Sequence, residues 1–246
     1  MYSVAGIRRA NELHRPDQAV GAGSRAAMLN PSGSKSPEPK QVVFVVDDDL
    51  DVREGLRALL ESVQLGCEVF AGAGDFLKRK PSNVVSCLIL DVRLPGPSGL
   101  DVQAELAAAH IDIPIIFITG HGDIPMSVRA MRAGAVEFLT KPVRGQDLLD
   151  AVGIALDRDR VRRERDGKLN DLKERYETLS ARERQVLQFV TDGLLNKQIA
   201  GRLSLSEVTV KVHRHNMMKK LGAKSLSDLV KMAQSLRMVG EQWPAL

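Results

Sequence analysis

A chain of 246 residues is long enough for one large domain or two ordinary ones, and its hydrophobic content of 43% excludes wholesale disorder. No stretch approaches the roughly 18 apolar residues of a transmembrane helix, and the N-terminus lacks a secretory apolar core, so we expect a cytoplasmic protein with no membrane partner. The net charge is +4, and the residues from Ala181 onward hold eleven Lys and Arg against five Asp and Glu, which indicates a polyanionic partner such as nucleic acid.

Residues 1–39 are polar and are interrupted by glycine, serine and proline, a composition typical of a disordered segment. After them, short apolar runs that predict buried strands alternate with amphipathic stretches that predict helices. The predicted strands are Val42–Val46, Cys67–Phe70, Val84–Leu90, Ile113–Ile118 and Ala135–Leu139. Five such strands separated by helices predict an α/β fold, a doubly wound parallel sheet with helices on both faces. Two cysteines fall in strand runs, where we expect buried, reduced thiols.

A long linker helix is predicted over residues 158–177. The helix that begins near Leu148 continues without proline through a charged run and then regains apolar spacing up to Tyr176. Gly167 is the weak point of this helix, because glycine destabilises a helix interior by about 1 kcal/mol relative to alanine.

Residues 178–240 predict an all-α domain of four short helices. The second and third helices are joined by a tight turn at Ser204, which is the pattern of a helix-turn-helix. Four residues have the types expected at helix ends: Ser180, Ser206 and Ser225 as N-caps, and Gly222 after the third helix.

Polar side chains stand at the ends of four predicted strands: Asp47 with Asp48, Asp91, Thr119 and Lys141. Because the carboxyl ends of parallel strands share one edge, we expect these side chains to lie together. Clustered carboxylates repel one another and require cations, which Lys141 and a bound Mg²⁺ supply. A carboxylate held in this way is equipped to attack phosphorus. The alternative, unrelated polar residues at strand ends, is common for one position and rare for four in order.

The third helix of the C-terminal domain presents two faces. Apolar residues expected in the core share one of them: Val210, Met217 and Leu221. Lys211, His215 and Lys219 recur every four residues on another face, with Val212 beside them. Hydrogen-bond donors next to a small apolar group suit the major groove of DNA. Standing alone, such a helix would be interpreted as ordinary basic surface.

Residues 41–157 resemble a response-regulator receiver domain, and we place this domain at 40–157. The resemblance rests on the acidic pair in VVDDD and on LILDVRLPGPSG, FITGHGD and EFLTKP, which occur in order. It implies a flavodoxin-like fold of five parallel strands and a cis bond between Lys141 and Pro142. The site residues that it implies are Asp91 as phosphoryl acceptor, Asp47, Asp48 and the backbone carbonyl of Arg93 as further Mg²⁺ ligands, Thr119 and Lys141 as phosphoryl contacts, and Phe138 as switch aromatic.

The stretch LSARERQVLQFVTDGLLNKQIAGRLSLSEVTVKVHRHNMMKKLGAKS resembles the LuxR-type DNA-binding domain. This resemblance implies that Lys211, Val212 and His215 face the bases, and it makes Thr209, Asn196 and Lys197 candidates for phosphate contacts. The role of Arg214 is open at this stage. Its spacing points partly inward, although its stem could carry the guanidinium to a phosphate.

Taken together, residues 41–236 resemble the FixJ/NarL class of two-component transcriptional regulators, nearer to the FixJ side. The resemblance implies a sensor histidine kinase, RNA polymerase, double-stranded promoter DNA and a second copy of the chain as partners. In FixJ-like proteins the dimer contact lies on the face that corresponds to the helix Ile124–Ala133 and the strand Ala135–Leu139. Whether an unphosphorylated receiver covers the recognition helix or only fails to dimerise stays open.

Two other classes of protein compete with this interpretation. A phosphohydrolase with an aspartate nucleophile would need a carboxylate two residues after Asp91, where the chain has Arg93, and would leave the basic helix-turn-helix unexplained. A DNA-binding protein with an inactive receiver would not need the acidic pair together with Thr119 and Lys141, all of which are present.

Overall fold

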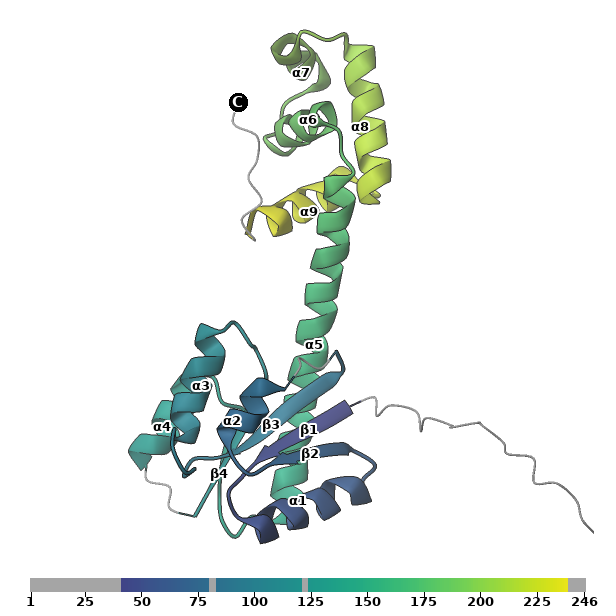
Figure 1. Ribbon diagram of the computed structural model, residues 1–246. Coiled ribbons are helices and arrows are strands. Elements are labelled where there is room, and N and C mark those ends of the chain that lie inside the picture. Colours follow the sequence, from purple (N-terminus) through teal and green to yellow (C-terminus); the bar gives the residue numbers. More distant parts are fainter. Residues whose placement is uncertain (1–40, 80–82, 121–123, 239–246) are drawn as a thin grey trace, which may run out of the picture. The chain divides into compact units, whose positions relative to one another are not determined.

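The computed structural model describes residues 41–79, 83–120 and 124–238. Within them, five parallel strands form one sheet in the order β2-β1-β3-β4-β5 (Figure 1). The strands are β1 (Gln41–Val46), β2 (Gly66–Phe70), β3 (Val85–Asp91), β4 (Ile115–Thr119) and β5 (Glu137–Thr140). The predicted doubly wound parallel sheet is therefore confirmed, while the predicted disordered segment 1–39 and the end of the segment 178–240 lie outside the described residues.

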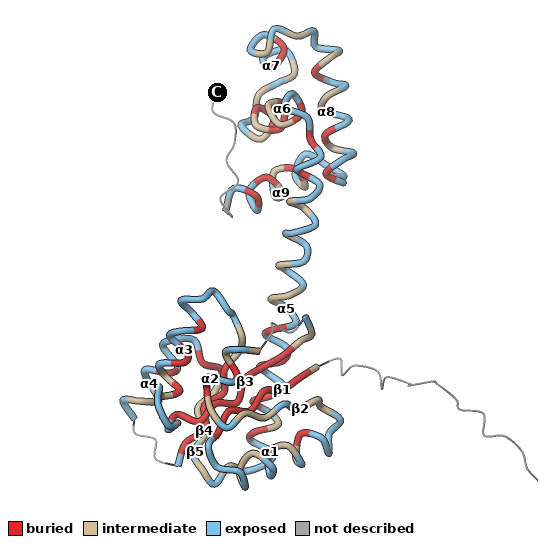
Figure 2. The backbone as a smooth tube through the Cα atoms, in the orientation of Figure 1, coloured by how far each residue is buried: buried red, intermediate tan, exposed pale blue. Residues whose placement is uncertain are grey.

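Helices cover both faces of this sheet. They are α1 (Leu50–Ser62) and the first part of α5 (Gly145–Glu177) on one face, and α2 (Ala73–Lys78), α3 (Gly99–Ala108) and α4 (Ile124–Arg132) on the other. Alternate residues of a strand point to opposite faces. Phe44 of β1 accordingly packs in the cluster of α2, α3 and α4, and its neighbour Val45 packs in the cluster of α1 and α5. Figure 2 shows the three central strands β1, β3 and β4 as almost continuously buried, whereas the edge strands β2 and β5 are only partly buried.

Two strands begin two residues later than the sequence predicts. β4 starts at Ile115, because Pro114 has no N–H to give to a ladder; its carbonyl accepts a hydrogen bond from the amide of Leu88 at 2.9 Å. Before β5, the amide of Ala135 bonds the carbonyl of Ala130 at 3.1 Å, so this residue completes the turn that ends α4. Both cysteines are free, and burial raises the pKa of the Cys87 thiol to about 12.

Four further helices follow α5 and enclose a separate apolar core. They are α6 (Ala181–Thr191), α7 (Asn196–Leu203), α8 (Glu207–Leu221) and α9 (Leu226–Met238). The caps predicted from the sequence are present: the side chains of Ser180, Ser206 and Ser225 each accept a hydrogen bond from the backbone amide three residues later. Gly222 ends α8 with φ of 75°, a left-handed conformation that glycine adopts without strain.

The helix α5 is continuous through Gly167 and has a buried carboxylate where it passes the start of β3. Asp159 is fully buried, and it accepts a hydrogen bond from the amide of Ser86 at 2.9 Å. Two arginines one turn further on neutralise it: Arg162 and Arg163 each lie 2.5 Å from one of its oxygens. This hydrogen bond joins α5 to β3, the strand that ends in Asp91, and its partners are 73 positions apart in the sequence.

We predict that Asp159→Asn weakens the attachment of α5 to the sheet. The neutral amide cannot balance two arginines, so unfolding free energy should fall by about 1–3 kcal/mol, and trypsin should cleave faster after Arg162 or Arg163. Asp157→Asn is the matched control, because Asp157 is exposed and pairs only with Arg160 in the part of the chain that the structure describes. Equal cleavage rates for the two variants would contradict the anchoring role.

Candidate functional site

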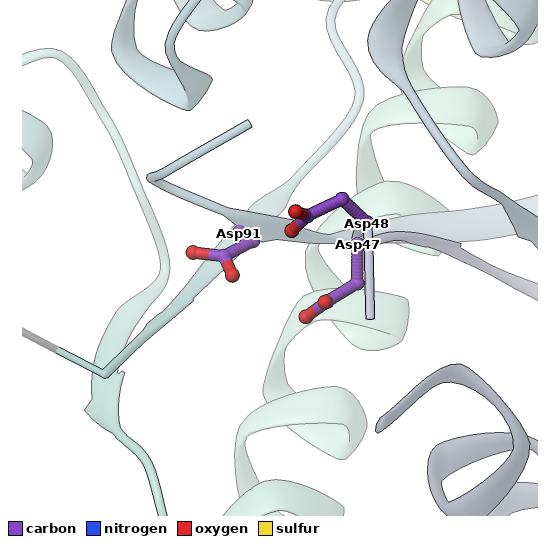
Figure 3. Close-up of side chains that lie close together, drawn as sticks. All are labelled: Asp47, Asp48 and Asp91. Atoms are coloured by element: carbon purple, nitrogen blue, oxygen red, sulfur yellow. The ribbon is translucent and has the colours of Figure 1, made fainter. Parts of the chain in front are cut away.

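Three carboxylates meet at the carboxyl edge of the sheet. Asp47 and Asp48 follow β1, and Asp91 is the last residue of β3, which pairs with β1 so that Val46 lies opposite Leu90. One oxygen of each carboxylate lies within 4.8 Å of the others (Figure 3). Asp47 and Asp91 are buried, whereas Asp48 is exposed. Two carboxylates of the cluster are therefore in the protein interior, and the cluster is open to solvent on the side of Asp48.

Lys141 bridges two of these carboxylates. Its Nζ lies 2.7 Å from Oδ2 of Asp47 and 2.6 Å from Oδ2 of Asp91. Burial raises the pKa of Asp47, and the hydrogen bond from Lys141 offsets this only in part. Burial would lower the pKa of Lys141, but its bonds to the two aspartates outweigh that effect and raise the pKa. The side chain is therefore a fixed positive charge at neutral pH.

The backbone around the cluster is held by local hydrogen bonds. Asp49, the third acid of the run, is not part of the cluster: its side chain caps α1 by accepting from the amides of Asp51 and Val52. The amide of Arg93 donates to Oδ1 of Asp91 at 2.9 Å. The amide of Lys141 donates to the carbonyl of Thr119 at 2.8 Å, and the bond from Lys141 to Pro142 is cis, as the resemblance implies.

Gly99 lies next to the site, at the end of the stretch LILDVRLPGPSG, and no role was predicted for it. Its amide donates to the carbonyl of Val92 at 2.9 Å, and a Cβ at this position would lie 2.4 Å from the backbone oxygen of Asp91. The first turn of α3 therefore approaches the end of β3 so closely that a side chain would displace it. The run of glycine and proline after Asp91 was the only signal in the sequence, and it did not distinguish Gly99 from Gly96.

Thr119 and Phe138 occupy the two neighbouring strands. Thr119 ends β4 and is fully buried, one register position beyond the residue that pairs with Asp91. Phe138 lies in β5, is partly buried, and has its ring 6.2 Å from that of Phe117. Thr119 is therefore on the strand next to β3, and Phe138 is one strand further from the acidic cluster.

The donor set of the cluster fits a hard divalent cation. Three carboxylates with one bridging ammonium leave an excess of negative charge, and oxygen ligands with an open side suit Mg²⁺, which retains water when bound. Chemically, the arrangement combines an oxygen nucleophile with positive charges that stabilise a phosphoryl group during transfer.

A second candidate site is the pair α7 and α8. The turn between these helices contains Ser204 in the left-handed conformation, with φ of 53°. Arg214 of α8 donates a hydrogen bond to the side chain of Asn196 at 3.2 Å, which ties the start of α7 to the middle of α8. The guanidinium of Arg214 is thereby directed to the neighbouring helix α7.

The exposed face of α8 carries the residues that the sequence predicts to face the bases. Lys211, Val212 and His215 are all exposed, and so is Lys197 at the start of α7. Thr209 is partly buried and its hydroxyl lies 2.8 Å from that of Ser206. These residues could all meet one DNA duplex, because they belong to two helices fixed to each other.

Lys220 has a different role from its neighbour Lys219. Its Nζ lies 2.7 Å from the buried carboxylate of Glu183 and 3.1 Å from the carbonyl of Thr178, so it joins α8 to the start of α6. Burial acts to raise the pKa of Glu183, but the bonds from Lys220 and Ser180 together lower it. Both lysines are exposed, but Lys220 stabilises the fold through these contacts.

Comparisons with known proteins assign both halves of the chain. Residues 43–153 match the family model of the response regulator receiver domain, and residues 177–233 match that of the bacterial regulatory proteins of the luxR family. Nodulation protein W of Bradyrhizobium diazoefficiens is 53% identical over 204 residues, which are 83% of this chain and 90% of that protein. The chain belongs to the response regulators that carry a luxR-family DNA-binding domain.

Other relatives of this response regulator support the same family. Transcriptional regulatory protein FixJ of Bradyrhizobium diazoefficiens is 37% identical over 199 residues, or 81% of this chain and 97% of that protein. The solved structure of response regulator StyR is 51% identical, covers 79% of this chain and 98% of its own, and gives a TM-score of 0.71. The family is one of DNA-binding regulators, so the phosphohydrolase alternative is set aside. Among the described helices, none is long and apolar enough to cross a bilayer.

We predict that Gly99→Ala destabilises the receiver. The added methyl group would collide with the backbone of Asp91, so we expect a loss of about 1–3 kcal/mol in unfolding free energy, measured by denaturant titration. Gly55→Ala is the control, since a Cβ there meets nothing within 4 Å and alanine favours the helix α1. A Gly99→Ala variant as stable as Gly55→Ala would show that the close approach is unimportant.

Proposed function

We propose that Asp91 is the phosphoryl acceptor of this response regulator and that a sensor histidine kinase is the donor. The observation that carries the proposal is the ammonium of Lys141 between Asp47 and Asp91. A carboxylate oxygen of Asp91 attacks the phosphorus of a phosphohistidine; a P–O bond forms, the P–N bond breaks, and the imidazole leaves. Lys141 then balances charge on the phosphoryl oxygens.

Mg²⁺ is the proposed cofactor of this transfer. Asp47, Asp48, Asp91 and the backbone carbonyl of Arg93 would hold it, and when bound it neutralises phosphoryl oxygens. The three carboxylates within 4.8 Å of one another support this set. Thr119 and Lys141 are the proposed phosphoryl contacts. Phe138 is the proposed switch aromatic, because its ring packs beside the strand that ends at Thr119.

We propose that α8 reads promoter DNA in the major groove. Lys211, Val212 and His215 are the proposed base contacts, supported by their exposure on one side of the helix. Thr209, Asn196, Lys197 and Arg214 are the proposed phosphate contacts. Since Arg214 and Asn196 already bond each other, they would approach the DNA backbone as a unit.

The proposed output is regulation of transcription by a phosphorylated homodimer in the cytoplasm, with RNA polymerase as a further partner. The helix α4 supports dimerisation: Ile124, Val128 and Met131 recur at helical spacing and are exposed by 80%, 40% and 43%. An apolar stripe of this kind favours a partner surface.

We propose domain limits of 40–157 for the receiver, 158–177 for the linker helix and 178–240 for the DNA-binding domain.

We predict that phosphorylation requires Asp91. Wild-type protein incubated with Mg²⁺ and a small phosphodonor should gain the mass of one phosphoryl group, and Asp91→Asn should gain none, because its amide is not a nucleophile. The measurement is intact-protein mass spectrometry. Asp75→Asn, which changes an exposed acid in α2, is expected to behave as wild type. Equal uptake by Asp91→Asn would refute the assignment.

We predict that replacing Lys211 and replacing Lys197 change DNA binding in different ways. Lys211→Ala or His215→Ala should lower the preference for the operator over random DNA by roughly 1–3 kcal/mol, since each removes a base contact. Lys197→Ala should weaken binding to the operator and to random DNA by the same factor. It should also reduce the slope of log affinity against log salt concentration by about 1, the value for one lost phosphate contact. Binding titrations at several salt concentrations test this. If Lys211→Ala changed only the salt slope, base reading by Lys211 would be wrong.

We predict that a phosphoryl mimic makes the protein dimeric through α4. Light scattering with Mg²⁺ and beryllium fluoride should show the mass double, and Val128→Glu should prevent the doubling because it places a charge in the apolar stripe. Ile154→Glu changes an exposed apolar residue of α5 and is the control. A wild-type protein that stays monomeric would favour release of a covered recognition helix instead.

A further inference from the structure

Two valines on α8 expose large fractions of their side chains to solvent. Val208 is 70% exposed and Val212 is 52% exposed. An isolated exposed valine needs no explanation in a protein surface. These two are spaced by four residues, however, so their Cβ atoms lie about 5–6 Å apart and form one apolar patch. Val212 is already among the proposed base contacts, and Val208 has no assigned role.

The position of Val208 around the helix places it on the proposed DNA-facing side. Successive residues of a helix are rotated by about 100°. On this geometry Val208 falls within one stripe, about 100° wide, that also contains Lys211, Val212, His215 and Lys219. The buried residues of α8 lie on nearly the opposite side: Val210, Met217 and Leu221. Val208 therefore lies on the same side of α8 as Lys211 and His215.

The position of Val208 along the helix also supports a contact with DNA. It is the second residue of α8, immediately after the capping residue Ser206 and Glu207. In helix-turn-helix proteins the N-terminal residues of the second helix contact the base edges. Lys211 and His215 flank the valine patch with cationic and hydrogen-bonding groups, which suit a polyanion better than an apolar protein surface.

We propose that Val208 is a specificity residue that packs on the 5-methyl group of a thymine in each half-site. The side chain has no polar atom, so it can distinguish bases only by apolar contact, and the thymine methyl is the apolar group that base pairs present in the major groove. Together with Val212 it would favour thymine over cytosine at this position. The inference rests on the proposed binding of promoter DNA through α8.

The test uses the full-length protein with Mg²⁺ and beryllium fluoride. Its preferred DNA is first selected from a random pool, and each thymine of the half-site is then replaced by uracil, which removes only the methyl group. We expect one replacement to weaken wild-type binding by about fourfold, the change that corresponds to one methyl-sized contact. Val208→Ala should bind thymine DNA about fourfold more weakly and show no further loss with uracil at that position.

Two further variants separate the contact from a general defect. Val208→Thr keeps the shape and one methyl group, so it should retain part of the uracil effect. Leu226→Ala removes an exposed apolar side chain from α9 and should show the full wild-type effect. Alanine at position 208 favours the helix and removes no buried contact, so these variants are expected to fold.

The outcomes distinguish this inference from the proposed function. The thymine contact alone would be overturned if uracil weakened binding of wild type and of Val208→Ala by the same factor. It would also be overturned if uracil weakened the binding of neither protein. A wild-type protein that enriches no sequence from the pool would overturn DNA reading by α8 and the thymine contact together.

Discussion

The ammonium of Lys141 between Asp47 and Asp91 is the interaction on which the receiver site depends. Two buried carboxylates on neighbouring strands would repel each other strongly without it. Lys141 follows β5, which is the strand at one edge of the sheet. Its ammonium contacts Asp47, directly after β1, and Asp91, at the end of β3. One positive charge cannot balance three carboxylates, so the cluster has an excess of negative charge that only a further cation would neutralise. This excess of negative charge is the feature of the cluster that fits a hard divalent cation.

The strand β3 is constrained at both of its ends. At its carboxyl end, Asp91 is held by Lys141 and by the amide of Arg93, and Gly99 lets α3 approach its backbone closely. At its start, the amide of Ser86 binds the buried carboxylate of Asp159 on α5. Asp91 and α5 are therefore attached to the same strand. A displacement of β3 would act directly on the hydrogen bond between Ser86 and Asp159.

The helix α8 has one buried face and one exposed face. Val210, Met217 and Leu221 pack in the core, and Lys220 pairs with the buried Glu183, so these residues fix the orientation of the helix. The exposed residues on the opposite side of α8 include Lys211, Val212 and His215. Lys220 takes part in a contact between helices, a role that its charge alone does not reveal.

The sequence by itself determined the elements and most of the candidate site residues, because strand alternation, helix caps and helical spacing depend on neighbours within a few positions. The ends of the strands predicted that the acids, Thr119 and Lys141 would share an edge. Only the tertiary structure decided that Lys141 bridges partners 50 and 94 positions away, that Gly99 must lack a side chain, and that Asp159 binds β3. Those contacts depend on how distant segments pack, and no local pattern in the chain encodes a distance between them.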